Sequence, residues 1–99
     1  MIRGIVIDDK DNVIVAIYPL KTNTEISYRL GDVELPGPVV RHDIPLFHKV
    51  ARSAIPKGEP VIKYGEFIGV ATCDISEGDY VHTHNCVSSD DLYDETKVM

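Results

Sequence analysis

The sequence predicts a small all-β protein, and three observations support this. β-branched runs recur at short intervals, Gly, Pro, Asn and Asp separate them, and no window carries a capped helical stripe of ten or more residues. Residues 46–54 come closest to a helix, but flanking prolines leave room for one short turn only. The 99 residues suffice for one domain, placed at residues 1–87, and the acidic residues 88–99 predict a solvated tail or a docking segment.

The N-terminal segment predicts a β-hairpin. Residues 3–7 and 13–18 are β-branched runs, and the stretch DDKDN between them is rich in residues that favour turns. Residues 13–18 are apolar on both faces of a pleated strand, which predicts a strand that is covered on both sides.

The next two segments differ in their predicted place within a sheet. In residues 25–30, Ile26, Tyr28 and Leu30 alternate with polar residues and predict a strand with one buried face. Residues 33–40 contain two prolines, which cannot donate to a ladder of backbone hydrogen bonds. This segment is therefore expected at a sheet edge or in a loop.

The second half contains a short internal repeat. The stretch AIPKGEPV at residues 54–61 recurs as DISEGDYV at residues 74–81. Gly58 and Gly78 occupy equivalent positions and predict two tight turns with positive φ, each leading into a strand.

Composition and charge exclude several classes of protein. The formal net charge is −6 and the basic residues are scattered, which argues against a nucleic-acid partner. Nowhere do 18 apolar residues run together, so no membrane anchor is predicted. Cys73 and Cys86 form no CxxC or zinc-type spacing and predict two buried thiols in a reducing compartment, the cytoplasm.

The stretch DYVHTHNC contains the most conspicuous candidate site. His82 and His84 lie at i and i+2 on a predicted strand, so they should share one face with Cβ atoms roughly 6–7 Å apart. Two such imidazoles can share a divalent ion, but a complete site needs further ligands. The residues alone leave three readings open: a metal site, part of an active site completed by another chain, or two surface histidines.

Two other segments carry candidate binding residues. Lys49 is suited to pair with a substrate carboxylate, and His48 beside it to donate a hydrogen bond; alternatively, His48 caps backbone carbonyls in a loop. The turn KYGE presents Lys63 either to an anion or simply to solvent. The sequence contains no P-loop and no dinucleotide fingerprint.

A family resemblance covers residues 44–85. The stretches IPLFHKVA, IPKGEPVIKYGEFIGVAT and ISEGDYVHTHN resemble the small SAF domain of the altronate/galactarate dehydratase family, and also the small subunit of sulfolactate sulfo-lyases. The earlier stretch DDKDNVIVAIYPL is similar to the opening of that domain. The resemblance implies a β-clip fold. One departure is Phe47, which stands where the family commonly has glycine before the HK pair.

The resemblance also implies a function. Such enzymes remove water or sulfite from a hydroxy acid, and most of their catalytic groups lie in a much larger domain. The chain is therefore expected to be the small subunit, or an N-terminal fragment, of a sugar-acid dehydratase, a carbon–oxygen lyase that is inactive without its larger partner. It would close over the partner's active site and help to bind a hydroxy-carboxylate substrate.

The residue roles that the resemblance implies follow the family's motifs. His82 and His84 are the expected catalytic residues, and His48, Lys49 and Asn85 are expected to bind substrate. No cofactor is assigned to this chain, whereas a divalent metal of the iron type is expected in the partner subunit. The alternatives are a non-catalytic module that binds a sugar acid or a protein, and a self-contained metalloprotein that uses His82 and His84. A homo-oligomer of the isolated chain is also compatible with the sequence.

Overall fold

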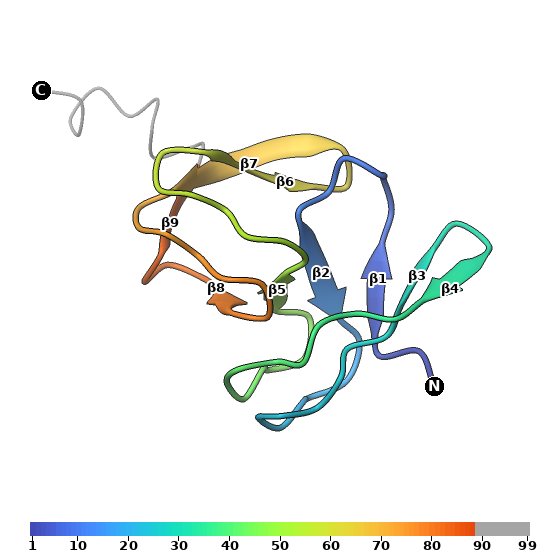
Figure 1. The fold of residues 1–99 in the computed structure, drawn as a ribbon. Helices are drawn as coiled ribbons and strands as arrows, with labels where there is room; N and C mark the ends of the chain where they lie inside the picture. Colours follow the sequence, from blue (N-terminus) through green and yellow to red (C-terminus); the bar gives the residue numbers. More distant parts are fainter. Residues whose placement is uncertain (89–99) are drawn as a thin grey trace, which may run out of the picture.

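The computed structural model describes residues 1–88, which form nine β-strands and contain no helix (Figure 1). The strands are β1 (Gly4–Val6), β2 (Val13–Ala16), β3 (Tyr28–Leu30), β4 (Val33–Leu35), β5 (Lys49–Ala51), β6 (Pro60–Lys63), β7 (Glu66–Ala71), β8 (Tyr80–Val81) and β9 (Cys86–Ser88). The all-β prediction is confirmed. The predicted acidic tail lies outside the described residues except for Ser88, which belongs to β9.

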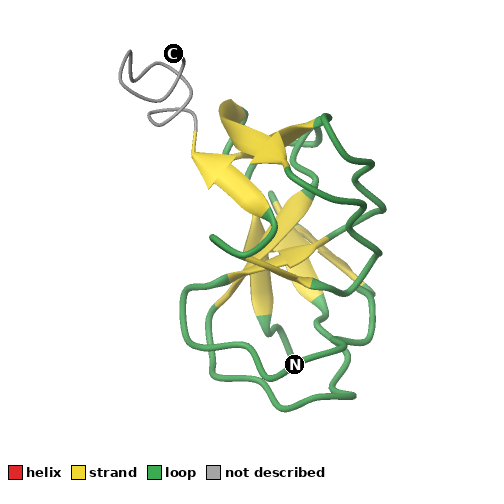
Figure 2. Cartoon of the chain, turned by 90° about the vertical axis from the view of Figure 1, so that its left-hand side faces the viewer, coloured by secondary structure: helices red, strands yellow, loops and turns green. Residues whose placement is uncertain are grey.

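The strands form two sheets. The larger has the order β4-β3-β1-β2-β5-β8 and the smaller the order β6-β7-β9. Within both sheets, the pairing of β1 with β3 is parallel and the other pairings are antiparallel. Figures 1 and 2 show the smaller sheet across one end of the larger, so the two sheets meet along an interface near β2, β5 and β6.

The predicted hairpin is confirmed, and its doubly covered strand is confirmed over residues 13–16 but not at Tyr18, which is 49% exposed. Strands β1 and β2 pair with Gly4 opposite Ala16, and every residue of β2 is buried. Ile14 and Ala16 belong to one hydrophobic core, while Val13 belongs to a second core with residues of the smaller sheet. Strand β2 therefore contributes to both cores, which explains why it is apolar at every position.

The structure also confirms the buried face of residues 25–30. Ile26 and Tyr28 are buried in the first core and Leu30 packs against it, while β4 lies at the sheet edge as predicted. The short helical turn considered for residues 46–54 is absent, because residues 49–51 form β5 between β2 and β8. No helix of residues 1–88 reaches the length and apolarity that a membrane span requires.

The predicted repeat is confirmed as a pair of equivalent turns. Ile55 and Ile75 exchange backbone hydrogen bonds across an antiparallel bridge, with both N···O distances at 2.8 Å. Gly58 and Gly78, three residues further on, have φ of 87° and 88°. The amide of Gly58 donates to the carbonyl of Ala71, and the amide of Gly78 donates to that of Ala51.

A second pair of turns has the same geometry but was not visible in the sequence. Leu20 and Ile44 form the matching bridge, also with two bonds of 2.8 Å. The residues three positions later are Asn23 and Phe47, with φ of 75° and 66°. Among these four turns, only the one at Phe47 thus has a bulky side chain at the residue with positive φ.

This geometry strains the backbone at Phe47, the position where the resemblance implies a glycine. A left-handed conformation costs a residue with a Cβ atom about 1–2 kcal/mol. The Phe47 side chain is 68% exposed, so little burial offsets that cost. The difference at this position therefore concerns backbone strain in the turn before His48.

We predict that Phe47→Gly raises the free energy of unfolding by about 1 kcal/mol, because it relieves the left-handed strain. Gly58→Ala is the matched control with the opposite expected effect, because it adds a Cβ atom at the equivalent position of another turn. A Cβ at Gly58 would meet no atom within 4 Å, so only the φ of 87° opposes it and stability should fall by about 1 kcal/mol. Urea unfolding of both variants tests this, and a Phe47→Gly protein less stable than the parent would contradict it.

Two adjacent polar residues after β1 join the sheets. Asp11 is 3% exposed, and its carboxylate accepts hydrogen bonds from the amides of Ile7 and Asp8 at 3.2 Å and from that of Gly65 at 2.7 Å. Gly65 lies in the turn between β6 and β7. The buried carboxylate therefore holds the β1–β2 turn of one sheet against the hairpin of the other.

Asn12 continues this joint along β6. Its side-chain amide donates to the carbonyl of Pro60 at 2.8 Å, and its Oδ1 accepts from the amide of Ile62 at 2.8 Å. The backbone amide of Asn12 also donates to the carbonyl of Ile62 at 3.1 Å. We call Asp11 and Asn12 the sheet joint.

Asp11→Ala should lower the free energy of unfolding by about 3 kcal/mol, because it leaves the part-buried amides of Ile7, Asp8 and Gly65 without their acceptor. Asp9→Ala is the control. The Asp9 side chain is 92% exposed and approaches Arg52 at 3.8 Å, a surface ion pair whose loss should change stability by less than about 1 kcal/mol. Equal effects of the two changes in thermal or urea unfolding would refute the role of the sheet joint.

Candidate functional site

The pairing of β5 with β8 brings two of the predicted histidines together. Lys49 lies opposite Val81 and Val50 opposite Tyr80. His48 directly precedes Lys49, and His82 directly follows Val81. The centroids of their two rings therefore lie only 4.9 Å apart. Thirty-four residues of sequence separate these histidines, so only the strand pairing reveals that they are neighbours.

Tyr80 connects all three histidines, and the sequence analysis missed it. Its hydroxyl forms a hydrogen bond with Nδ1 of His48. Its ring stacks on His82 with an interplanar angle of 8° and lies 5.6 Å from the rings of both His82 and His84. We call His48, Tyr80, His82 and His84 the histidine cluster. The spacing of Tyr80 and His82 at positions i and i+2 was the signal that could have identified it.

The prediction that His82 and His84 lie on a strand is wrong. Strand β8 ends at Val81, and residues 82–85 form a turn in which the amide of Asn85 donates to the carbonyl of His82 at 3.1 Å. Both histidines are nevertheless exposed and both approach the ring of Tyr80.

Asn85 explains this turn. It is 5% exposed, its Oδ1 accepts from the amide of His82 at 3.0 Å, and its amide donates to the carbonyl of Tyr80 at 2.8 Å. Both polar atoms of the side chain therefore bond to the backbone. Its expected role in substrate binding stays a prediction, and its contacts here shape the turn that carries the histidines.

A metal ion at His82 and His84 would need ligands from elsewhere. Within residues 1–88, no group of three or more His, Cys, Asp or Glu side chains is arranged to hold a metal ion. The described part of the chain therefore does not fit a self-contained metal centre. The expected metal of a partner subunit stays a prediction.

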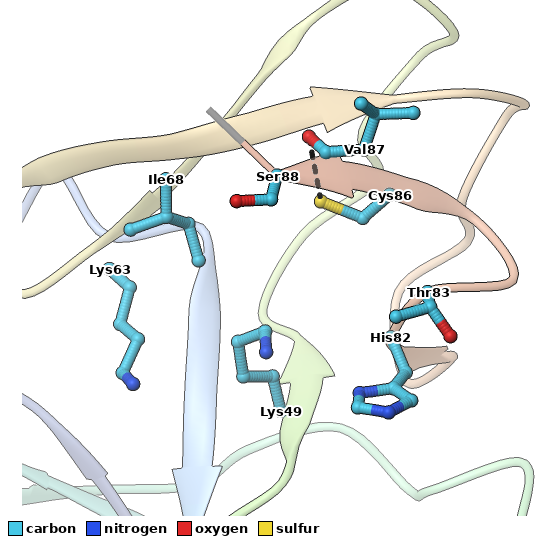
Figure 3. Close-up of a pocket in the computed structure, with 8 residues that line it drawn as sticks. All are labelled: Lys49, Lys63, Ile68, His82, Thr83, Cys86, Val87 and Ser88. Carbon is cyan, nitrogen blue, oxygen red and sulfur yellow. Dashed lines mark hydrogen bonds between the residues drawn. The ribbon is translucent and has the colours of Figure 1, made fainter. Parts of the chain in front are cut away.

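A pocket of about 430 Å³ adjoins the histidine cluster at the interface of the two sheets (Figure 3). Its walls are formed by Lys49, Lys63, Ile68, His82, Thr83, Cys86, Val87 and Ser88. Figure 3 shows Lys63, Lys49 and His82 along one side, facing the residues of β7 and β9. The sequence predicts Lys49 and His82 as site residues, and it leaves open whether Lys63 faces an anion or solvent.

Burial and neighbouring charges lower the pKa values of two groups in this pocket, Lys49 and His82. Burial, and then the positive charge of Lys63, lowers the pKa of the Lys49 amine. Desolvation lowers the pKa of His82, helped by the charges of His48, Lys49 and His84. His82 is therefore mainly a neutral imidazole at pH 7, able to accept or to donate one proton.

The two cysteines differ in their surroundings. Burial raises the pKa of the Cys86 thiol, with Lys49 as a smaller opposing influence, so Cys86 is a protonated, partly buried pocket residue. Cys73 is exposed, which corrects the prediction of a buried thiol. It lies in the bend after β7 ends at Ala71, beyond the strand that would have buried it.

Comparison with known families decides the classification. The family described as the altronate/galactarate dehydratase SAF domain matches residues 2–89. The chain belongs to this family. The match extends from before β1 through β9, so it includes both sheets, the histidine cluster and the pocket.

Curated relatives of the SAF domain include enzymes of two kinds. The chain is 45% identical to altronate dehydratase of Escherichia coli (strain K12) over 75 residues, which are 76% of this chain and 14% of that protein. It is 33% identical to altronate dehydratase of Bacillus subtilis (strain 168) over 79 residues, 80% of this chain and 15% of that protein. It is 54% identical to (2R)-sulfolactate sulfo-lyase subunit alpha of Paracoccus pantotrophus over 44 residues, 44% of this chain and 66% of that subunit. The aligned SAF domain is thus a small part of the dehydratases.

We predict that Lys49→Met raises the pKa of His82, because a neighbouring positive charge is removed while most of the side-chain volume is kept. The pH at which the His82 ring signals titrate in NMR spectra measures this. Lys57→Met is the control, since Lys57 lies in the turn from Ile55 to Gly58 and not in the pocket. An unchanged or lower His82 pKa in the Lys49→Met protein would contradict the described electrostatics.

Proposed function

We propose that this SAF domain is part of a hydroxy-acid lyase of the sugar-acid dehydratase type and works together with a larger catalytic domain or subunit. The family match and the names of the dehydratase and sulfo-lyase relatives support this proposal. The small share of the dehydratases that the chain covers supports the need for a larger partner. The divalent metal and the cytoplasmic location expected from the sequence are parts of the same proposal.

One observation carries the assignment of the site. Three histidines and two lysines from three separate segments gather at one pocket and its rim, in a chain of net charge −6. Such a cationic pocket is suited to the carboxylate of a hydroxy acid. We propose that the domain covers the partner's active site with this face, binds the substrate's acidic end and excludes water.

The chemistry of dehydration suits the residues of the histidine cluster. A base must take the proton next to the substrate carboxylate, and an acid must protonate the hydroxyl so that it leaves as water. Neutral His82 can take up a proton at neutral pH, and His84 at the same tyrosine ring is a second proton carrier. Tyr80 is the positioning residue that holds His48 and His82 in place.

The second candidate function is a binding module without a catalytic duty. Lys49 and Lys63 alone would suffice to bind a sugar acid, with the histidines only shaping the pocket rim. The two functions differ in the constant that the histidines should affect: kcat if the domain takes part in catalysis, and KM if it only binds substrate.

The first test is reconstitution. The isolated chain should show no turnover of altronate or galactarate, and activity should require the larger catalytic polypeptide together with this domain. A large polypeptide that is equally active without the domain would refute the proposed function.

The second test is the double change His82→Ala and His84→Ala in the assembled enzyme. We expect kcat to fall by about 10²–10⁴-fold, the range for lost proton transfer. His42→Ala is the matched control, because His42 is exposed and lies 3.9 Å from Asp79, outside the histidine cluster. A rise in KM with unchanged kcat would favour the binding module instead.

A further inference from the structure

The turn between β6 and β7 has an unusual residue at its first position. Tyr64 and Gly65 connect Lys63 to Glu66, which lie opposite each other in the strand register. The φ angles of Tyr64 and Gly65 are 55° and 77°. Two-residue hairpin loops in which both φ angles are positive strongly prefer Asn followed by Gly, because few side chains tolerate the first position. Gly65 fits this rule, whereas Tyr64 holds a strained backbone conformation.

Neither burial nor a hydroxyl hydrogen bond accounts for a tyrosine at this place. Tyr64 is 44% exposed. The tyrosine hydroxyls with hydrogen bonds in the described part of the chain are those of Tyr28 and Tyr80. Tyr64 makes its contact through its ring, whose centre lies 5.0 Å from the amine of Lys63. This distance is within the range of a cation–π interaction.

Lys63 makes this contact although an acidic residue lies across from it. Opposite charges at facing positions of paired strands attract each other, so Glu66 would be the usual partner of Lys63. The ion pairs within residues 1–88 nevertheless include neither residue. Lys63 instead lines the wall of the pocket (Figure 3), where its charge contributes to lowering the pKa of Lys49. The amine is therefore held at the pocket and is not paired at the turn.

The turn itself is closely fixed to the larger sheet. The amide of Gly65 donates to the buried carboxylate of Asp11 at 2.7 Å. A Cβ atom built on Gly65 would lie only 3.0 Å from Oδ2 of Asp8, so the turn also packs tightly against the segment after β1. The sheet joint thus fixes the backbone that carries the Tyr64 ring, and the ring has a defined place beside the Lys63 amine.

We infer that Tyr64 is a positioning residue, whose ring keeps the Lys63 amine on the pocket wall although the turn is strained. This inference rests on the proposed function, in which the pocket binds the acidic end of the substrate, and it adds a residue that acts there only through Lys63. Because the contact uses the ring and not the hydroxyl, phenylalanine should replace Tyr64 in this role and asparagine should not.

The first test compares Tyr64→Phe with Tyr64→Asn in the full chain by NMR. The ring should shift the signals of the Lys63 ε-protons upfield in the parent and in Tyr64→Phe, and Tyr64→Asn should lose this shift. The pKa of Lys49 should be higher in Tyr64→Asn than in Tyr64→Phe, because the Lys63 charge leaves the pocket. Neither variant carries a phenol at this position that titrates in the same pH range. Tyr64→Asn should also unfold at a higher urea concentration, since Asn tolerates a positive φ.

Tyr18→Asn is the matched control. Tyr18 is 49% exposed and does not line the pocket, so this change should leave the Lys63 signals and the pKa of Lys49 as in the parent. Equal Lys49 pKa values in Tyr64→Phe and Tyr64→Asn, or Lys63 signals that are the same in both, would overturn the inference. A Tyr64→Asn protein that is less stable than Tyr64→Phe would also overturn it, because the turn would then not be strained by the tyrosine.

The second test measures the assembled enzyme with altronate. Tyr64→Asn should raise KM about threefold, the effect of losing one exposed cation–π contact, and leave kcat within about twofold of the parent. Tyr64→Phe should leave both constants unchanged. An unchanged KM in Tyr64→Asn would overturn the positioning role. A larger polypeptide that is fully active without the domain would instead overturn the proposed function and leave the NMR result standing, so the two failures are distinguishable.

Discussion

The buried carboxylate of Asp11 is the interaction on which the arrangement of the two sheets depends. A carboxylate withdrawn from water must be satisfied by donors, and the structure supplies backbone amides from both sides of the sheet interface. Asn12 adds three further hydrogen bonds to β6. Because β6 carries Lys63, this joint also decides that a lysine of one sheet lines a pocket with a lysine of the other.

A single turn geometry, used four times, builds the rest of the site. The turn that ends at Phe47 leads into His48 and β5, and the turn that ends at Gly78 leads into Tyr80 and β8. Strands β5 and β8 then pair, which places the segments that follow the two turns side by side. The histidine cluster is therefore a product of repetition: two similar turns deliver two polar segments to the same place.

The electrostatics of the pocket give its residues distinct tasks. Desolvation, helped by the charges of His48, Lys49 and His84, lowers the pKa of His82, while Lys49 and Lys63 place two amines at the same pocket. A neutral imidazole beside a bound carboxylate is suited to proton transfer, because binding the anion would in turn favour a proton on the ring. Under the proposed function, substrate binding and proton uptake would thus reinforce each other.

The sequence by itself determined the elements whose cause is local. The β-branched runs, the glycine turns at residues 58 and 78, and the doubly covered strand all follow from short-range patterns, although that strand ends at Ala16 and not at residue 18. The motifs HTHN and HK contain the three histidines that the structure brings together at Tyr80.

Only the tertiary structure decided how those motifs meet. The side chain of Asn85 bends the predicted strand at residues 82–85 into a turn, and the hydroxyl of Tyr80 reaches His48 across 32 residues of sequence. The pocket exists because the sheet joint brings β6 and β9 against β5. Such contacts depend on strand pairing and on buried hydrogen bonds between distant segments, which no local pattern of residues encodes.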